Sequence, residues 1–265
     1  MGDLRKRVGS AAVGGPLTIL LFLFLPPVPF LLLMGLVCAM AVHEWASMAQ
    51  VRDNVTVIVL ALSAFVPLFM DLPWLYPLWL LFSGALYLLL MIVRPRHEDP
   101  SINQNIGRFL VVLLISQLFL CIPLFSFYRL KKFSPFVPAI LVLIIWSSDT
   151  AAYFTGKSLG RHRLAPVISP KKTVEGLVGA IAGALAVTLL FHRPMGMTPL
   201  AAAGIGAAIG LLGQLGDMLE SIGKRVCSVK DSSSLIPGHG GILDRIDSFI
   251  LTAPFLSWYL AGFMR

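Results

Sequence analysis

Apolar runs of about 20 residues, separated by short polar stretches, dominate the hydrophobic pattern of this chain. Such a run crosses a bilayer as an α-helix, because a helix rises about 1.5 Å per residue and the hydrocarbon core is about 30 Å thick. The pattern therefore predicts an all-α polytopic membrane protein with nine spans. The expected spans cover residues 10–25, 28–49, 55–71, 74–93, 107–127, 134–155, 174–191, 198–222 and 246–263. Because the run over 55–71 is short, eight spans plus a re-entrant segment is the alternative.

The positive charges divide unequally between the two sides that nine spans create. One side carries the N-terminus and the loops 50–54, 94–106, 156–173 and 223–245. With Arg108 assigned to it, that side holds 16 of the 21 Lys and Arg residues. Loops rich in Lys and Arg stay in the cytoplasm. We therefore expect a multi-pass protein of the cell membrane with a cytoplasmic N-terminus and an external C-terminus.

Composition excludes several other classes of protein. The chain of 265 residues is 57% hydrophobic and only 13% charged, which a soluble domain of this length would not be. The net charge of +8 is explained by basic residues at membrane boundaries, and we expect no nucleic-acid partner. Three cysteines lie far apart without CxxC spacing, so they predict neither a disulfide framework nor a zinc site.

We expect two regions along the chain. Residues 1–130 look like a transmembrane scaffold, and residues 131–265 form the catalytic region with cytoplasmic loops 156–173 and 223–245. The expected helices over 174–191 and 198–222 are rich in glycine, and small residues let helix backbones approach closely in lipid. This pattern predicts a tight helical cluster around the charged residues.

The segment from Asp217 to Asp247 holds nine acidic or basic residues in 31, next to apolar spans where charge is costly. If the eighth helix continues through Lys224, then Asp217, Ser221 and Lys224 share one face. Asp244 and Asp247 stand where the ninth helix begins. Three carboxylates without a cysteine or histidine cluster suit a hard cation, and Mg²⁺ commonly joins carboxylates to substrate phosphates.

Phosphate is the expected ligand of the remaining polar residues. The turn Pro237-Gly238-His239-Gly240-Gly241 can bring main-chain N–H groups close to an anion. The basic residues that flank this turn are Lys224, Arg225, Lys230 and Arg245. A second polar stretch, with Ser169, Lys171 and Lys172, precedes the seventh span on the same side. Asp149 is a lone acid in the sixth span, where it either pairs with a lysine or contacts a cation.

The stretch SIGKRVCSVKDSSSLIPGHGGILDRID resembles the signature of the phosphatidate cytidylyltransferases, the CDP-diacylglycerol synthases. Its fixed positions here are Ser221, Lys224-Arg225, Lys230-Asp231, Pro237 to Gly241, Asp244-Arg245 and Asp247. The upstream stretch from Asp149 to Gly176 is also similar to the family, whereas the first 130 residues match only in hydropathy. Gly223 and Ser233-Ser234 depart from the family pattern.

The resemblance implies transfer of a cytidylyl group from CTP to phosphatidate, which gives CDP-diacylglycerol and pyrophosphate for phospholipid synthesis. It implies Mg²⁺ and a homodimer, and it leaves a nearby K⁺ open. It assigns the metal to Asp217, Asp244 and Asp247, and catalysis to Ser221, Lys224, Arg225 and Asp247. The implied substrate-binding residues are Ser169, Lys171, Lys172, Lys230, Gly238, His239, Gly240, Gly241 and Arg245. The distribution of Lys and Arg predicts that this site faces the cytoplasm.

Two other functions fit parts of the pattern. A CTP-dependent lipid kinase would also use Mg²⁺ and basic residues, but it would transfer the γ-phosphoryl group and release CDP. A transporter would use buried charges as an ion path, and such proteins often contain inverted repeats. We find no such repeat, and the charge gathers at one end of the chain.

Overall fold

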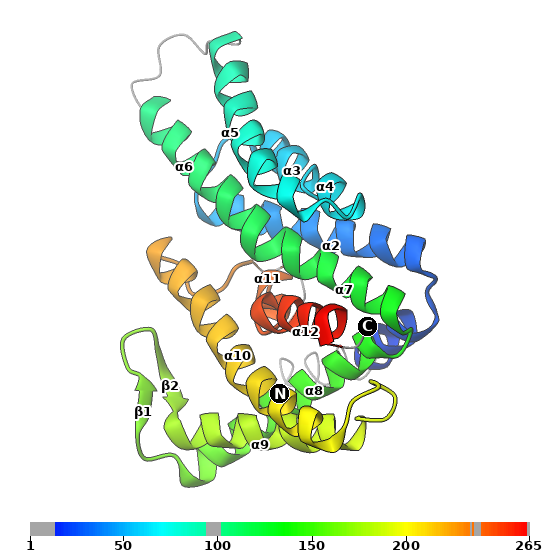
Figure 1. The fold of residues 1–265 in the computed structure, drawn as a ribbon. Coiled ribbons are helices and arrows are strands. Elements are labelled where there is room, and N and C mark those ends of the chain that lie inside the picture. Colours follow the sequence, from blue (N-terminus) through cyan, green and yellow to red (C-terminus); the bar gives the residue numbers. More distant parts are fainter. Residues whose placement is uncertain (1–13, 94–101, 234, 236–239, 264–265) are drawn as a thin grey trace.

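The computed structural model describes residues 14–93, 102–233, 235 and 240–263, and these residues are nearly all helical (Figure 1). A helix over Gly14–Phe24 comes first. The following helices are α2 (Pro27–Met48), α3 (Asn54–Leu62), α4 (Phe65–Phe69), η1 (Pro73–Leu75), α5 (Tyr76–Val93), α6 (Ile102–Ser116), η2 (Gln117–Cys121) and α7 (Ile122–Phe133). The second half contains α8 (Val137–Leu159), β1 (Arg163–Ala165), β2 (Ser169–Thr173), α9 (Val174–Leu190), α10 (Pro199–Val226), α11 (Leu243–Ile246) and α12 (Phe249–Phe263).

The helices bear out a helical membrane protein. Within the described residues, four apolar helices are long enough to cross a bilayer: Pro27–Met48, Asn105–Phe133, Val137–Leu159 and Pro199–Val226. The shorter apolar helices are Gly14–Phe24, Asn54–Phe69, Tyr76–Met91 and Val174–Leu190. The number of nine spans and the orientation of the termini stay predictions.

Local sequence signals explain where several of these helices begin. Thr173 precedes α9, and its hydroxyl accepts a hydrogen bond from the N–H of Gly176 at 3.1 Å. Thr198 accepts from the N–H of Ala201 in the same way at the start of α10, with Pro199 as the first helical residue. Both arrangements satisfy N–H groups that the first turn leaves without a partner, and proline there loses no hydrogen bond.

The fold is nearly all α, as predicted, but the expected loop 156–173 is largely structured. α8 continues to Leu159, and β1 and β2 then form an antiparallel hairpin that pairs Arg163 with Thr173 and Ala165 with Ser169. The hairpin lies beside α10 at the edge of the molecule (Figure 1). Two strands this short give almost no periodic signal in the sequence, so the pattern could not separate them from a loop.

The glycine-rich helices α9 and α10 pack closely, as predicted. A Cβ atom on Gly210 would lie 2.6 Å from the Cα atom of Ile181, and one on Gly206 would lie 2.8 Å from the Cα atom of Leu185. Only glycine permits this backbone approach. α9 packs in turn against α8, so these three helices form one layer beside the hairpin (Figure 1).

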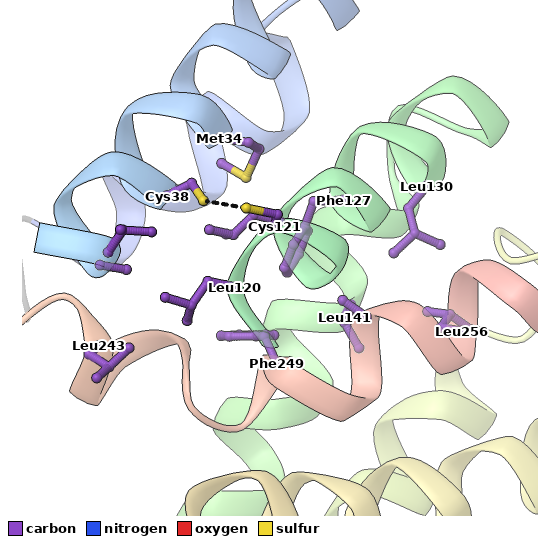
Figure 2. Packing of buried hydrophobic residues seen from close by; sticks show 14 of the residues in the cluster. Met34, Cys38, Leu120, Cys121, Phe127, Leu130, Leu141, Leu243, Phe249 and Leu256 are labelled. Atoms are coloured by element: carbon purple, nitrogen blue, oxygen red, sulfur yellow. Dashed lines mark hydrogen bonds between the residues drawn. The ribbon is translucent and has the colours of Figure 1, made fainter. Parts of the chain in front are cut away.

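The apolar core joins the two halves of the chain. Figure 2 shows residues of α2, η2 and α7 in contact with residues of α8, α11 and α12. Between α6 and α7, the π-helical turn η2 widens the backbone, and the carbonyl of Gln117 accepts a hydrogen bond from the hydroxyl of Tyr76 at 2.6 Å. The helix over the expected ninth span, 246–263, begins at Phe249, because the short helix α11 ends at Ile246 and a turn follows it.

Candidate active site

The last three turns of α10 carry the residues expected to share one face. α10 continues to Val226, so Asp217, Ser221 and Lys224 do lie on one helix. The hydroxyl of Ser221 is 3.4 Å from the Oδ1 atom of Asp217. The ammonium of Lys224 lies 2.5 Å from the Oε2 atom of Glu220 and 2.7 Å from the Oδ1 atom of Asp244. Lys224 therefore joins α10 to α11.

Three carboxylates converge where α10 passes the break between α11 and α12. One oxygen atom each from Asp217, Glu220 and Asp247 lies within 4.8 Å of the others. Gly216 makes this possible, because a Cβ atom there would lie 2.4 Å from the carbonyl oxygen of Asp247. Glu220 is buried, whereas Asp217 and Asp247 are partly exposed. We call these three residues the carboxylate cluster.

Asp244, which the resemblance places with the metal, has other partners in this arrangement. Its Oδ2 atom accepts hydrogen bonds from the hydroxyl of Ser232 at 2.8 Å and the N–H of Gly241 at 2.9 Å, while Oδ1 faces Lys224. Burial acts to raise the pKa of Asp244, but Lys224, Gly241 and Ser232 outweigh it and lower the pKa to about 2. Asp244 is therefore ionised at neutral pH, and its assignment to the metal stays a prediction.

The electrostatics of the carboxylate cluster favour a bound cation. Asp247 lies in the break between α11 and α12. Burial, followed by the nearby charges of Asp217 and Glu220, raises its pKa well above the ordinary value. Lys172 and Lys224 pair with Asp217 and Glu220, whereas Asp247 is held beside both of these carboxylates. Oxygen ligands of this kind suit a hard divalent ion such as Mg²⁺.

The hairpin brings a second lysine to the same place. The ammonium of Lys172, on β2, lies 2.8 Å from the Oδ2 atom of Asp217 and donates to the carbonyl of Gln214 at 3.2 Å. The side-chain amide of Gln214 donates to Asp149 at 3.3 Å, which connects α8 to the site. Residues that lie 42 and 65 positions from Gln214 in sequence thus meet on one face of α10.

The other predicted site residues are distributed around this centre. Lys171, Arg225, Lys230 and Arg245 are exposed, Ser169 is partly exposed, and Arg225 donates to the carbonyl of Val229 at 3.3 Å. Gly240 has a φ of +81°, as its expected turn requires. Gly238 and His239 lie outside the described residues. The roles of all these residues stay predictions.

Sequence reasoning missed two buried acids. Glu220 pairs with Lys224 one turn along α10 and also belongs to the carboxylate cluster, which its spacing from Lys224 alone does not indicate. Glu44, on α2, was not considered, although its side chain accepts hydrogen bonds from residues 232, 233, 242 and 243. A single acid inside an apolar run is the signal that could have identified Glu44, because such residues are rare in spans.

An apolar groove of about 810 Å³ lies against the cluster. Its walls come from the ends of α2 and α10 and from α6, and they include Met48, Val111, Ile115 and Val226. Glu220 lies in the same lining, so the groove and the cluster share a wall. This volume is within the usual range for ligand pockets.

Together these features define a helical membrane protein with a charged site at the end of its glycine-rich helices. The sequence profile of the cytidylyltransferase family matches residues 5–263, and the chain belongs to this family. A protein of Haemophilus influenzae named phosphatidate cytidylyltransferase is 32% identical over 287 residues, covering 97% of this chain and 98% of that protein.

Shorter matches are more similar. A Bacillus subtilis protein with the same name is 48% identical over 123 residues, covering 46% of each chain. A Staphylococcus aureus protein of that name is 48% identical over 117 residues, covering 43% of this chain and 45% of that protein. This chain thus spans about half the length of these two relatives.

Proposed function

We propose that this protein transfers the cytidylyl group of CTP to phosphatidate, giving CDP-diacylglycerol and pyrophosphate for phospholipid synthesis. The observation that carries the proposal is the meeting of the carboxylate cluster with Lys172 and Lys224 in a member of the cytidylyltransferase family. The full-length similarity to a protein named phosphatidate cytidylyltransferase supports the same reaction.

The donor set fits Mg²⁺, because the cluster offers three carboxylates and hard divalent ions prefer oxygen ligands. Asp217 and Asp247 would hold the ion, with Glu220 as the third carboxylate. When bound, Mg²⁺ neutralises phosphate charge and orients the nucleotide. Asp244 remains an alternative ligand, and K⁺ is a further proposal that rests on the resemblance alone.

The protein's own residues would bring two anionic substrates together. An oxygen of the lipid phosphate attacks the α-phosphorus of CTP, a new P–O bond forms, and the bond to the bridging oxygen breaks as pyrophosphate leaves. The lipid phosphate is already an anion at neutral pH, so this step needs little general base. Lys172 and Lys224 would position the phosphates, with Lys171, Arg225, Lys230 and Arg245 as additional positive charge. The turn over residues 237–241 and Ser169 would contact the nucleotide phosphates, and Ser221 would line the site.

The apolar groove supports a lipid acceptor. It would admit an acyl chain from the cytoplasmic leaflet, while its shared wall at Glu220 keeps the headgroup near the charged residues. Arg108 also belongs to its lining and could meet an anionic headgroup. Location in the cell membrane, a site facing the cytoplasm and a homodimer are further parts of the proposal.

A labelled nucleotide distinguishes the proposed reaction from its alternatives. Purified protein in vesicles with phosphatidate and Mg²⁺ receives CTP labelled either in cytosine or at the γ-phosphate. We expect the cytosine label in the lipid fraction and the γ-label in pyrophosphate. A γ-label in the lipid would instead identify a kinase. Ion or solute flux without nucleotide, and without labelled lipid, would support a transporter.

A further inference from the structure

Glu44 is a buried acid that comes from the N-terminal half of the chain. It lies one turn before the end of α2, and only 4% of its surface is exposed. A carboxylate in such a place is costly unless its oxygen atoms are satisfied by donors. The residues that donate hydrogen bonds to Glu44 therefore indicate its role.

Four hydrogen bonds join Glu44 to described residues between Ser232 and Leu243, where α11 begins. Its Oε1 atom accepts from the hydroxyl of Ser233 at 2.6 Å and the N–H of Ile242 at 2.9 Å. Its Oε2 atom accepts from the hydroxyl of Ser232 at 3.1 Å and the N–H of Leu243 at 2.9 Å. The carboxylate thus fastens both ends of the segment 232–243 to α2.

Two features of the loop fit this contact closely. A Cβ atom on Gly241 would lie 2.4 Å from Oε2 and 2.6 Å from Oε1 of Glu44, so a larger residue would collide with the carboxylate. The hydroxyl of Ser233 supplies the shortest of the four hydrogen bonds, at 2.6 Å. In this chain the loop and Glu44 are therefore fitted to each other.

The contact continues to the charged centre. The hydroxyl of Ser232 lies 3.1 Å from Glu44 and 2.8 Å from Asp244, and Asp244 also accepts from the N–H of Gly241. Asp244 in turn holds Lys224, which pairs with Glu220. A movement of the loop would therefore displace Asp244 and Lys224 relative to the carboxylate cluster.

We infer that Glu44 is a positioning residue for the nucleotide and cation side of the active site, acting through Ser232, Gly241 and Asp244. The inference rests on the proposed function and makes α2 part of the active site rather than a scaffold. It also gives Gly241 a role in the loop's packing, besides the predicted contact with phosphate.

A positioning role and simple stabilisation of the fold predict different measurements. Glu44→Gln keeps the size of the side chain but replaces one acceptor oxygen with an N–H₂ group, which would face donors of the loop. Loss of a hydrogen bond to a charged group changes an equilibrium constant by roughly 10- to 100-fold. We expect the Mg²⁺ concentration for half-maximal rate and the KM for CTP to rise by about that factor, with the KM for phosphatidate unchanged.

The control is His43→Gln, on the neighbouring, exposed position of α2. It should leave all three parameters at the wild-type values. A cycle with Ser233→Ala provides a second readout. If both residues act through one contact, Glu44→Gln should cost less in the Ser233→Ala background than in the wild type.

Purified Glu44→Gln protein with wild-type KM for CTP and wild-type Mg²⁺ requirement would overturn the inference. Equal changes for both substrates, or additive effects of the two substitutions, would also overturn it, because they would indicate general loss of structure. Failure of the proposed function is separate: wild-type protein would then form no CDP-lipid. In that case the Glu44→Gln and Ser233→Ala cycle is measured through the rise in the unfolding midpoint that Mg²⁺ causes. Glu44→Gln should still reduce this rise. Additive effects of the two substitutions would refute the inference.

Discussion

Individual residues of this site are defined by how their charges are balanced. Asp244 has Lys224, a hydroxyl and an N–H group, whereas Asp247 faces two other carboxylates. The same residue type, three positions apart, is therefore held in two opposite electrostatic states. Two predictions test this contrast.

Asp247→Asn should lower the rate of CDP-lipid formation by at least about 100-fold while the protein stays folded. The raised pKa of Asp247 means that its charge is unfavourable in the folded state without a cation, so neutralising it should not lower the midpoint of thermal unfolding. Saturating Mg²⁺ should raise that midpoint for the wild type but much less for the variant. Equal stabilisation of both proteins by Mg²⁺ would remove Asp247 from the cation site.

The lowered pKa of Asp244 predicts an opposite dependence on pH. Its folded pKa of about 2 lies below the ordinary value of 3.8, so its ionised form stabilises the folded state above about pH 4. We expect the free energy of unfolding of the wild type to exceed that of Asp244→Asn by about 2 kcal/mol at pH 7. This difference should decrease as the pH falls below about 4 and through about 2. Thermal unfolding of both proteins in detergent from pH 7 to pH 2 measures it. A difference that grows toward low pH would contradict the assigned contacts.

At the scale of elements, the site depends on where helices end and how closely they pass. α10 extends beyond its apolar run and carries Glu220 to the wall of the groove between α2 and α6. The break between α11 and α12 presents Asp247 to α10 at Gly216, where the absence of a side chain allows close contact. Helix ends therefore determine both the charged centre and its apolar neighbour.

The groove predicts that acyl chains are recognised by α6. Val111→Trp, in the groove lining, should displace about two methylene groups of a long chain and raise the KM for that phosphatidate by roughly tenfold. The KM for short-chain phosphatidate and for CTP should not change. Leu114→Trp, on the same helix but outside the groove lining, is the matched control. A Val111→Trp enzyme without chain-length preference would show that the acyl chain binds elsewhere.

For the whole molecule, the sequence predicted local features better than contacts between residues far apart in the chain. The common face of Asp217, Ser221 and Lys224 follows from helical periodicity, and close packing of α9 and α10 follows from their glycines. Glu220 and Glu44 could not be placed, because their roles depend on contacts with residues 27 or more positions away. Periodicity carries no information on such distances, since it describes only one element at a time.

The two ends of α9 offer a test of orientation. Val167, at the tip of the hairpin before α9, is 91% exposed, and Arg193, after its C-terminus, is also exposed. α9 has 17 residues and so spans about 25 Å, close to the thickness of a hydrocarbon core. If α9 crosses the membrane as predicted, these two positions lie on opposite sides of it.

We therefore expect Val167→Cys to react with a membrane-impermeant maleimide only in inverted membrane vesicles, and Arg193→Cys only in intact cells. Cys227, which is partly exposed, is replaced first, whereas Cys38 and Cys121 are buried. Addition of detergent should make both introduced cysteines reactive. Because Lys172 reaches the carboxylate cluster from the hairpin, labelling of Val167→Cys also reports the side of the active site. Labelling of both cysteines from the same side would show that α9 does not cross the membrane. The side on which the charged centre lies would then follow from the side that was labelled.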